Sequence, residues 1–237
     1  DDLGRTTKEN LDELSLYNNK LREIPKGLPH LTNLTVLSLD LNMLTELPDK
    51  LCELTNLRKL SLLFNRVKRL SPSTRQLRQL KSLLLQHNDL ASVPAELGEL
   101  PELTELSITH NRLKEAPFLP RLVKLEQVGL SNNKLASLPT NLDALTNLSS
   151  IGLARNELTS LPPSLLALPN LVLLNASSNR IGPSLPPAPS ATKLAWLDLQ
   201  RNQLAQLPRR YALLPQLDTV LLNGNPLPEE LLVAAST

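Results

Sequence analysis

The sequence contains few of the residues that build disulfides, metal sites and phosphate-binding loops. Its 237 residues include one cysteine, Cys52, which cannot form a disulfide within the chain, so we expect a reducing compartment and a cytoplasmic location. Three histidines and one cysteine are too few for a typical structural zinc site. Only seven glycines are present and they do not cluster, which argues against a Gly-rich phosphate loop. We therefore expect neither a metal nor a cofactor.

An excess of charge of one sign, long apolar runs and catalytic motifs are also lacking. The 25 basic and 23 acidic side chains nearly balance, which argues against a nucleic acid or an anionic membrane as the partner. No uninterrupted apolar run is long enough to span a membrane. The chain has no nucleophile elbow, no His-Glu-x-x-His and no evident pair of carboxylates, so we predict that it is not an enzyme.

What the sequence has in abundance is a repeat. The pattern Leu-x-x-Leu-x-Leu-x-x-Asn-x-Leu recurs ten times, at intervals of 23 residues except for one interval of 22. Such self-similarity at a fixed period is typical of repeat architectures. The units begin at Leu11, Leu34, Leu57, Leu80, Leu103, Leu125, Leu148, Leu171, Leu194 and Leu217. The asparagines that follow in register are Asn19, Asn42, Asn65, Asn88, Asn111, Asn133, Asn156, Asn179, Asn202 and Asn225.

The first half of each unit alternates apolar and other residues, which predicts a strand with one buried face. In the second unit, Leu37 and Leu39 are predicted to face inward, and Ser38 and Asp40 to face outward. The asparagine of each unit follows the strand. There its amide can bond to backbone groups that the turn leaves unpaired, so we interpret the asparagines as structural.

The second half of each unit carries the prolines. Seven units place an apolar residue and a proline at the same offset, as in Leu47-Pro48 and Leu138-Pro139. Proline fixes its own backbone angle and cannot donate a hydrogen bond, so a long α-helix is disfavoured here. The pattern predicts short 3₁₀ turns, extended stretches and single helical turns instead.

From about Leu11 to Leu227 the chain resembles the leucine-rich repeat family, in the 23-residue, Leu-Pro-containing type known from Ras-pathway and Scribble-like scaffolds, plant Ras-group proteins and bacterial proteins. The resemblance implies an α/β repeat fold: a right-handed, curved solenoid with a parallel sheet on its concave face and short 3₁₀ or extended segments on its convex face. We predict one domain over residues 1–237, with ten repeats at about 11–227, a polar segment at 1–10 and a short cap at 228–237. Extracellular members commonly carry cysteine-rich caps, and none is visible, which indicates a reducing compartment or a chain cut inside its caps.

Some units depart from the pattern. In the eighth unit Ala176 replaces a strand leucine and the Pro-rich return segment 182–190 has lost its leucine spacing, which indicates either tolerated drift or a hinge or docking edge. Tyr211 occupies a leucine slot and is interpreted as a core substitute. Residues 1–10 are too polar to cover Leu14 and Leu16, which indicates a cut chain or a partner at that end. We expect a monomer, with self-association through this end as the alternative.

Candidate binding residues lie at outward strand positions, where large apolar side chains gather near both ends of the array. Contiguous exposed apolar patches are uncommon without a function, and aromatic side chains are frequent hot spots of protein interfaces. Some of these side chains can instead fill gaps between their neighbours. His87 and His110 hold the same position in adjacent units, and we interpret them as polar surface in preference to a metal-binding pair. The candidates are Tyr17, Asp40, Leu41, Leu63, Phe64, Leu84, His87 and His110 near one end, and Leu173, Trp196, Asp198 and Leu221 near the other.

These observations predict a non-catalytic module that binds a protein or peptide on its concave face. The alternative is the substrate-recognition arm of a larger signalling enzyme or effector, such as a ubiquitin ligase, kinase–GTPase or phosphatase, whose catalytic part lies outside this sequence. A self-associating structural element is a third possibility. The sequence identifies neither the partner nor the source.

Overall fold

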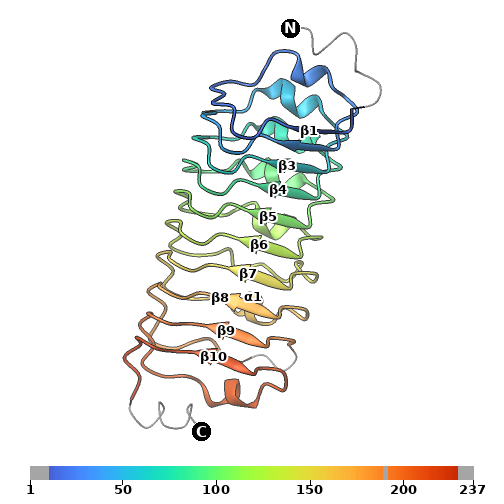
Figure 1. Cartoon of the computed structure of the whole chain (residues 1–237). Helices are drawn as coiled ribbons and strands as arrows, with labels where there is room; N and C mark the ends of the chain where they lie inside the picture. Colours follow the sequence, from blue (N-terminus) through green and yellow to red (C-terminus); the bar gives the residue numbers. More distant parts are fainter. Residues whose placement is uncertain (1–10, 189–191, 229–237) are drawn as a thin grey trace.

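The computed structural model of the chain describes residues 11–188 and 192–228. Within them ten short strands form one parallel sheet in which each strand pairs with its neighbours in chain order (Figure 1). The repeat register is therefore also the pairing register, as in Leu37 opposite Leu60. The strands are β1 (Glu13–Ser15), β2 (Val36–Ser38), β3 (Lys59–Ser61), β4 (Ser82–Leu84), β5 (Glu105–Ser107), β6 (Gln127–Gly129), β7 (Ser150–Gly152), β8 (Leu173–Asn175), β9 (Trp196–Asp198) and β10 (Thr219–Leu221).

The return segments carry the short turns that their prolines predict. Proline at position N1 or N2 opens several of them, where its missing N–H has no helical partner to lose. In the described part of the chain they are the 3₁₀ turns η2 (Leu28–His30), η3 (Asp49–Glu53), η4 (Pro72–Gln76), η5 (Ala95–Glu99), η6 (Leu119–Arg121) and η7 (Arg209–Leu213), and the single α-helical turn α1 (Pro163–Leu166).

The core runs continuously between the sheet and the return segments. Leu34, Leu37 and Leu39 are fully buried, as the period-two pattern predicts, and their equivalents in the third to ninth units are buried in the same way, whereas those of the tenth unit are only partly buried. The wider return segments lie on the outside of the curve and the sheet on its concave face. The predicted curved solenoid of ten parallel strands is confirmed.

The asparagines form a buried ladder of hydrogen bonds. Asn65 donates to the carbonyl of Leu39 in the preceding unit (2.9 Å) and to that of Leu62 in its own (3.2 Å), and its Oδ1 accepts from the backbone N–H of Leu44 (3.0 Å). The same contacts recur at Asn88 and Asn111. Each amide thus pairs backbone groups of two units that the turn would otherwise leave buried without a partner.

The third unit replaces the usual proline with Ser71 for a local reason. The Ser71 hydroxyl accepts from the N–H of Ser73 (3.0 Å) and so caps η4, and it also donates to Asp49. Thr74, at a leucine position, is buried and donates to the Ser71 carbonyl (2.6 Å). Burial, with a further contribution from Asp49, raises the pKa of the neighbouring Cys52 thiol to about 11, so this cysteine is not a nucleophile at neutral pH.

The eighth unit is repaired by its neighbour. Ala176 is completely buried, so the smaller side chain leaves no opening to solvent. Tyr211, from the next unit, is 1 % exposed and donates its hydroxyl to the Pro186 carbonyl (3.0 Å), which confirms that it is a core residue. Burial raises the pKa of this phenol. Residues 189 and 190 of the return segment lie outside the described residues.

The ends of the array are described only in part. Leu11, Leu14 and Leu16 of the first unit are only partly buried against the core. The predicted polar segment 1–10 and almost all of the predicted cap 228–237 fall outside the described residues, so the proposed domain boundaries remain predictions. The described segments contain no helix that is long and apolar enough to cross a membrane.

Candidate functional site

The candidate residues near the amino-terminal end form a column along one rim of the sheet. Leu41, Phe64, His87 and His110 occupy the same place in four successive units, immediately before the ladder asparagine, and we refer to them as the rim column. Their backbones bridge adjacent units, with the N–H of Leu41 donating to the Leu63 carbonyl (2.8 Å) and that of Phe64 to the Gln86 carbonyl (3.0 Å).

Three side chains of the rim column stack on one another. The Phe64 and His87 rings lie 4.2 Å apart, centroid to centroid, with an interplanar angle of 10°, and the His87 and His110 rings lie 4.0 Å apart at 14°. Offset-stacked rings at such spacing attract one another. Because the two imidazole planes are nearly parallel, their in-plane nitrogen lone pairs do not converge on a common point. The stacking therefore favours the surface interpretation of the histidines over a metal-binding pair.

The backbone of the rim column has a left-handed conformation. The φ angles of Leu41, Phe64, His87 and His110 lie between 53° and 55°. Asparagine and histidine tolerate this region, whereas a bulky apolar residue there is unfavourable by about 1–2 kcal/mol. The chain places asparagine at the equivalent position in other units, for example Asn132. Leu41 and Phe64 are thus held in a backbone conformation that other residues adopt more easily.

The rim column is open to solvent. Phe64 is 47 % exposed and Leu41 39 %, so neither belongs to the core. His87 is half-buried between its neighbours. Burial, followed by repulsion from His110, lowers its pKa, so the ring is neutral at neutral pH. The Leu41, Phe64 and His87 side chains therefore carry no charge under those conditions.

The other predicted residues of this end flank the rim column. Tyr17 is 56 % exposed on the first unit, while Leu63 and Leu84 are half-buried. Asp40 is largely occupied within the fold. One of its oxygens accepts from Ser61 Oγ (2.6 Å) and from the Leu63 N–H (2.8 Å), and the other from Ser38 Oγ (3.1 Å). Its principal role is to join the second and third units.

The candidates at the other end form a separate patch. Leu173 pairs directly with Trp196 across β8 and β9, and Leu221 pairs with Asp198 across β10 and β9. The expectation that Asp198 contributes an open surface is wrong. It is only 7 % exposed, and its carboxylate accepts from the Gln200 N–H (2.9 Å). The sequence reasoning missed Val172, which is 41 % exposed beside Leu173.

The two patches do not meet. Strands β6 and β7 lie between them, so β5 and β8 are roughly 15 Å apart at the usual strand spacing. On the outward face these two strands carry Gly129 and Gly152, which have no side chains. A partner that contacts both patches must therefore bridge a hollow in the face of the sheet.

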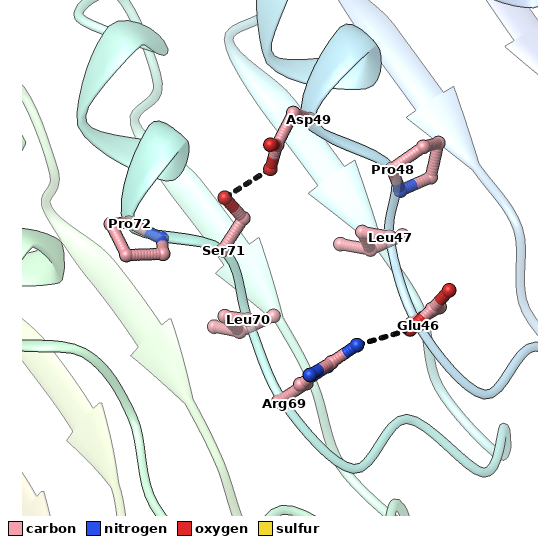
Figure 2. A pocket seen from close by; sticks show the side chains of 8 residues that line it. All are labelled: Glu46, Leu47, Pro48, Asp49, Arg69, Leu70, Ser71 and Pro72. Atoms are coloured by element: carbon pink, nitrogen blue, oxygen red, sulfur yellow. Dashed lines mark hydrogen bonds and ion pairs between the residues drawn. The ribbon is translucent and has the colours of Figure 1, made fainter.

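A larger hollow, of about 380 Å³, lies away from the concave face between the return segments of the second and third units. Figure 2 shows that its polar side chains pair with one another: Arg69 with Glu46 (2.9 Å) and Ser71 with Asp49. Groups that are already paired have little to offer a ligand. We therefore do not regard this hollow as the site. Residues 11–188 and 192–228 contain no group of three His, Cys, Asp or Glu side chains that could hold a metal ion.

An open parallel sheet face with side chains of successive rungs in register defines a solenoid repeat protein. Residues 9–67 and 55–113 match the family model for leucine-rich repeats. Residues 9–113 therefore carry leucine-rich repeats, and the remaining units continue the same repeat and the same sheet. Proteins of this family are typically non-catalytic modules for interaction with proteins or peptides.

Solved structures with the same architecture come from several sources. A leucine-rich repeat protein of Leptospira interrogans is 26 % identical with a TM-score of 0.57, over 95 % of this chain and 76 % of that one. Internalin C2 of Listeria monocytogenes is 27 % identical with a TM-score of 0.66, over 72 % and 73 %. The plant peptide hormone receptor RGFR1, solved in complex with RGF2, is 23 % identical with a TM-score of 0.67, over 86 % of this chain and 38 % of the receptor, and shows the fold alone. No curated protein matched the sequence.

Proposed function

We propose that the chain binds a protein or peptide partner without catalysis, through the rim column and the adjoining concave face. The observation that carries this proposal is the stack of Phe64, His87 and His110, which is exposed at Phe64 and held on a left-handed backbone. The left-handed backbone recurs at this position in every unit, from Asn18 to Gly224, so it aligns the rings, and the exposed aromatic stack is what distinguishes the rim column. Within the described residues no segment of the chain itself covers the column.

The partner that suits this surface presents an apolar side chain to Leu41 and Phe64. Covering these two side chains removes apolar area from water, which is the main favourable term in most protein associations. We assign the patch of Val172, Leu173 and Trp196, which lies on the same face, to a secondary contact. Trp196 is half-buried, so it offers a partner less open surface than Phe64 does.

The test is capture of partners by the immobilised chain from a lysate of its source, followed by mass spectrometry. Wild type is compared with Phe64→Asn and with the matched control Val123→Ser, since Val123 is 49 % exposed but lies in the turn before β6. We expect at least one protein to be captured by wild type and by the control and lost with Phe64→Asn. If the captured set is the same for all three chains, the rim column is not the binding site.

A further inference from the structure

A polar hollow of about 300 Å³ lies in the concave face beside the rim column. Gln86 and Thr109, which directly precede His87 and His110, line one side of it, and Glu105 of β5 lies on another. Its floor is low because Gly129 of β6 and Gly152 of β7 have no side chains. The hollow is large enough for one long side chain of a partner.

The floor depends on glycine. A β-carbon on Gly129 would lie 2.9 Å from Ser107 Oγ, and one on Gly152 would lie 3.1 Å from Ser131 Oγ. Side chains at these two positions would press on the hydroxyls beside them and fill the hollow. The space is therefore built into the sequence of the middle units.

The polar groups of the hollow favour a ligand that is positively charged and donates hydrogen bonds. In the described part of the chain Glu105 is the only charged residue that lines it; its carboxylate accepts from Ser82 Oγ (2.6 Å) and keeps further acceptor capacity. Among the described residues, Oε1 of Gln86 is the one buried side-chain oxygen or nitrogen without a hydrogen-bond partner. A buried acceptor in this condition is unfavourable, and a donor placed nearby allows the amide to turn and pair with it.

We propose that this hollow receives an arginine side chain of the protein or peptide partner. The inference deepens the proposed function and rests on it. A guanidinium carries five N–H donors in a planar fork, so it can pair with the Glu105 carboxylate and with other acceptors of the hollow at the same time, which a compact ammonium does less well. Within residues 11–188 and 192–228 no lysine, arginine or histidine lines the hollow to repel it. The basic side chains Lys59 and Lys81 belong to the third and fourth units and stand outside it.

The probe is the pentapeptide acetyl-Ala-Ala-Arg-Ala-Ala-amide, observed by NMR on chain labelled with ¹⁵N-glycine. The seven glycines give few signals, with Gly129 and Gly152 as reporters in the floor and Gly27 and Gly98 as controls in return segments. We expect saturable displacement of the two reporter signals alone, in the millimolar range expected of a single side chain. The lysine peptide should bind several-fold more weakly, and the uncharged citrulline peptide at least about tenfold, since charged hydrogen bonds are the stronger ones. Equal binding of the citrulline peptide, or no displacement by the arginine peptide, overturns the proposal.

Two variants separate the groups that make the site. Glu105→Gln should lower the affinity for the arginine peptide by about tenfold. Gln86→Leu should also weaken it while leaving the melting temperature unchanged or raised, because it removes an unpaired buried oxygen. The control Val123→Ser, in the turn before β6, should leave peptide binding unchanged. If the arginine peptide fails while partner capture still depends on Phe64, the hollow is misassigned and the proposed function stands. If the peptide binds while partner capture is indifferent to Phe64, the rim column is the part that is wrong.

Discussion

Two neighbouring residues with opposite orientations allow the binding surface to be tested apart from the fold. Leu62 is fully buried, whereas Phe64, two residues later, is 47 % exposed with a φ angle of 53°. We predict that Leu62→Ala destabilises the chain and that Phe64→Asn removes binding with little change in stability. Phe64→Ala is the companion variant that shortens the side chain without adding an amide.

The magnitudes follow from burial and backbone conformation. Leu62→Ala leaves a cavity in a closely packed core and should lower the free energy of unfolding by about 2–5 kcal/mol. Phe64→Asn loses a ring contact worth about 0.5–1.5 kcal/mol and relieves a backbone strain of about 1–2 kcal/mol, so its net effect on folding is close to zero. If Phe64 is an interface hot spot, its loss should make the free energy of partner binding less favourable by about 2 kcal/mol or more, which is about thirtyfold in affinity.

The assay is a set of thermal melts together with titrations of a captured partner against each chain. For a chain of this length 1 kcal/mol corresponds to roughly 2–4 °C, so Leu62→Ala should melt several degrees below wild type and Phe64→Asn within about 2 °C of it. Phe64→Ala should lose the same affinity as Phe64→Asn and slightly more stability. The reason is that a left-handed backbone conformation is less favourable for alanine than for asparagine. If Phe64→Asn or Phe64→Ala unfolds the chain as severely as Leu62→Ala, Phe64 is a core residue and the rim column is not a binding site.

Three further predictions concern other parts of the molecule. Gly182→Ala should destabilise the chain by a few kcal/mol, because the new β-carbon would lie 2.2 Å from the Gln203 carbonyl oxygen; a melting curve like that of wild type would contradict the packing of the eighth unit. Hydrogen exchange should show the backbone of the eighth unit opening before those of the second and sixth, and uniform protection would count against a weak rung. The free energy of unfolding should fall as the pH drops below about 6.5, because the lowered pKa of His87 means that the folded chain binds fewer protons than the unfolded chain below that pH; thermal melts at two pH values should show this dependence in wild type and a smaller one in His87→Asn.

Much of the fold could be predicted because the repeat states the same constraint ten times. The 23-residue period places Leu37 opposite Leu60, and the structure pairs these two residues. The asparagine after each strand predicts an amide side chain that hydrogen-bonds to backbone groups of the turn, and Asn65 makes these bonds. Such features depend on spacing and on residue type alone, and the sequence displays both.

The details of the site depend on properties that spacing does not display. The sequence places Phe64 and His87 on adjacent units, but the left-handed backbone that aligns their rings arises from the turn. Outward alternation alone also made Asp198 look available, although it turns back to accept from the Gln200 N–H. An alternation pattern predicts the face of the sheet on which a side chain lies. It does not predict which hydrogen bonds the polar atoms of that side chain make.

Irregular units show the same limit in the core, and they show why the array tolerates them. The fifth unit is one residue short, and it brings the Phe118 carbonyl so close to the fourth unit that a β-carbon on Gly98 would lie 2.8 Å from it. Glycine at position 98 makes room for the shortened neighbour, as Tyr211 makes contact with the irregular eighth unit. In a solenoid each repeat contacts only its neighbours, so a defect has to be absorbed within one rung on either side. The rim column obeys the same rule, because each ring of the stack is placed by the unit before and the unit after it. A one-residue change of repeat length between the second and fifth strands would therefore break the binding surface before it broke the core.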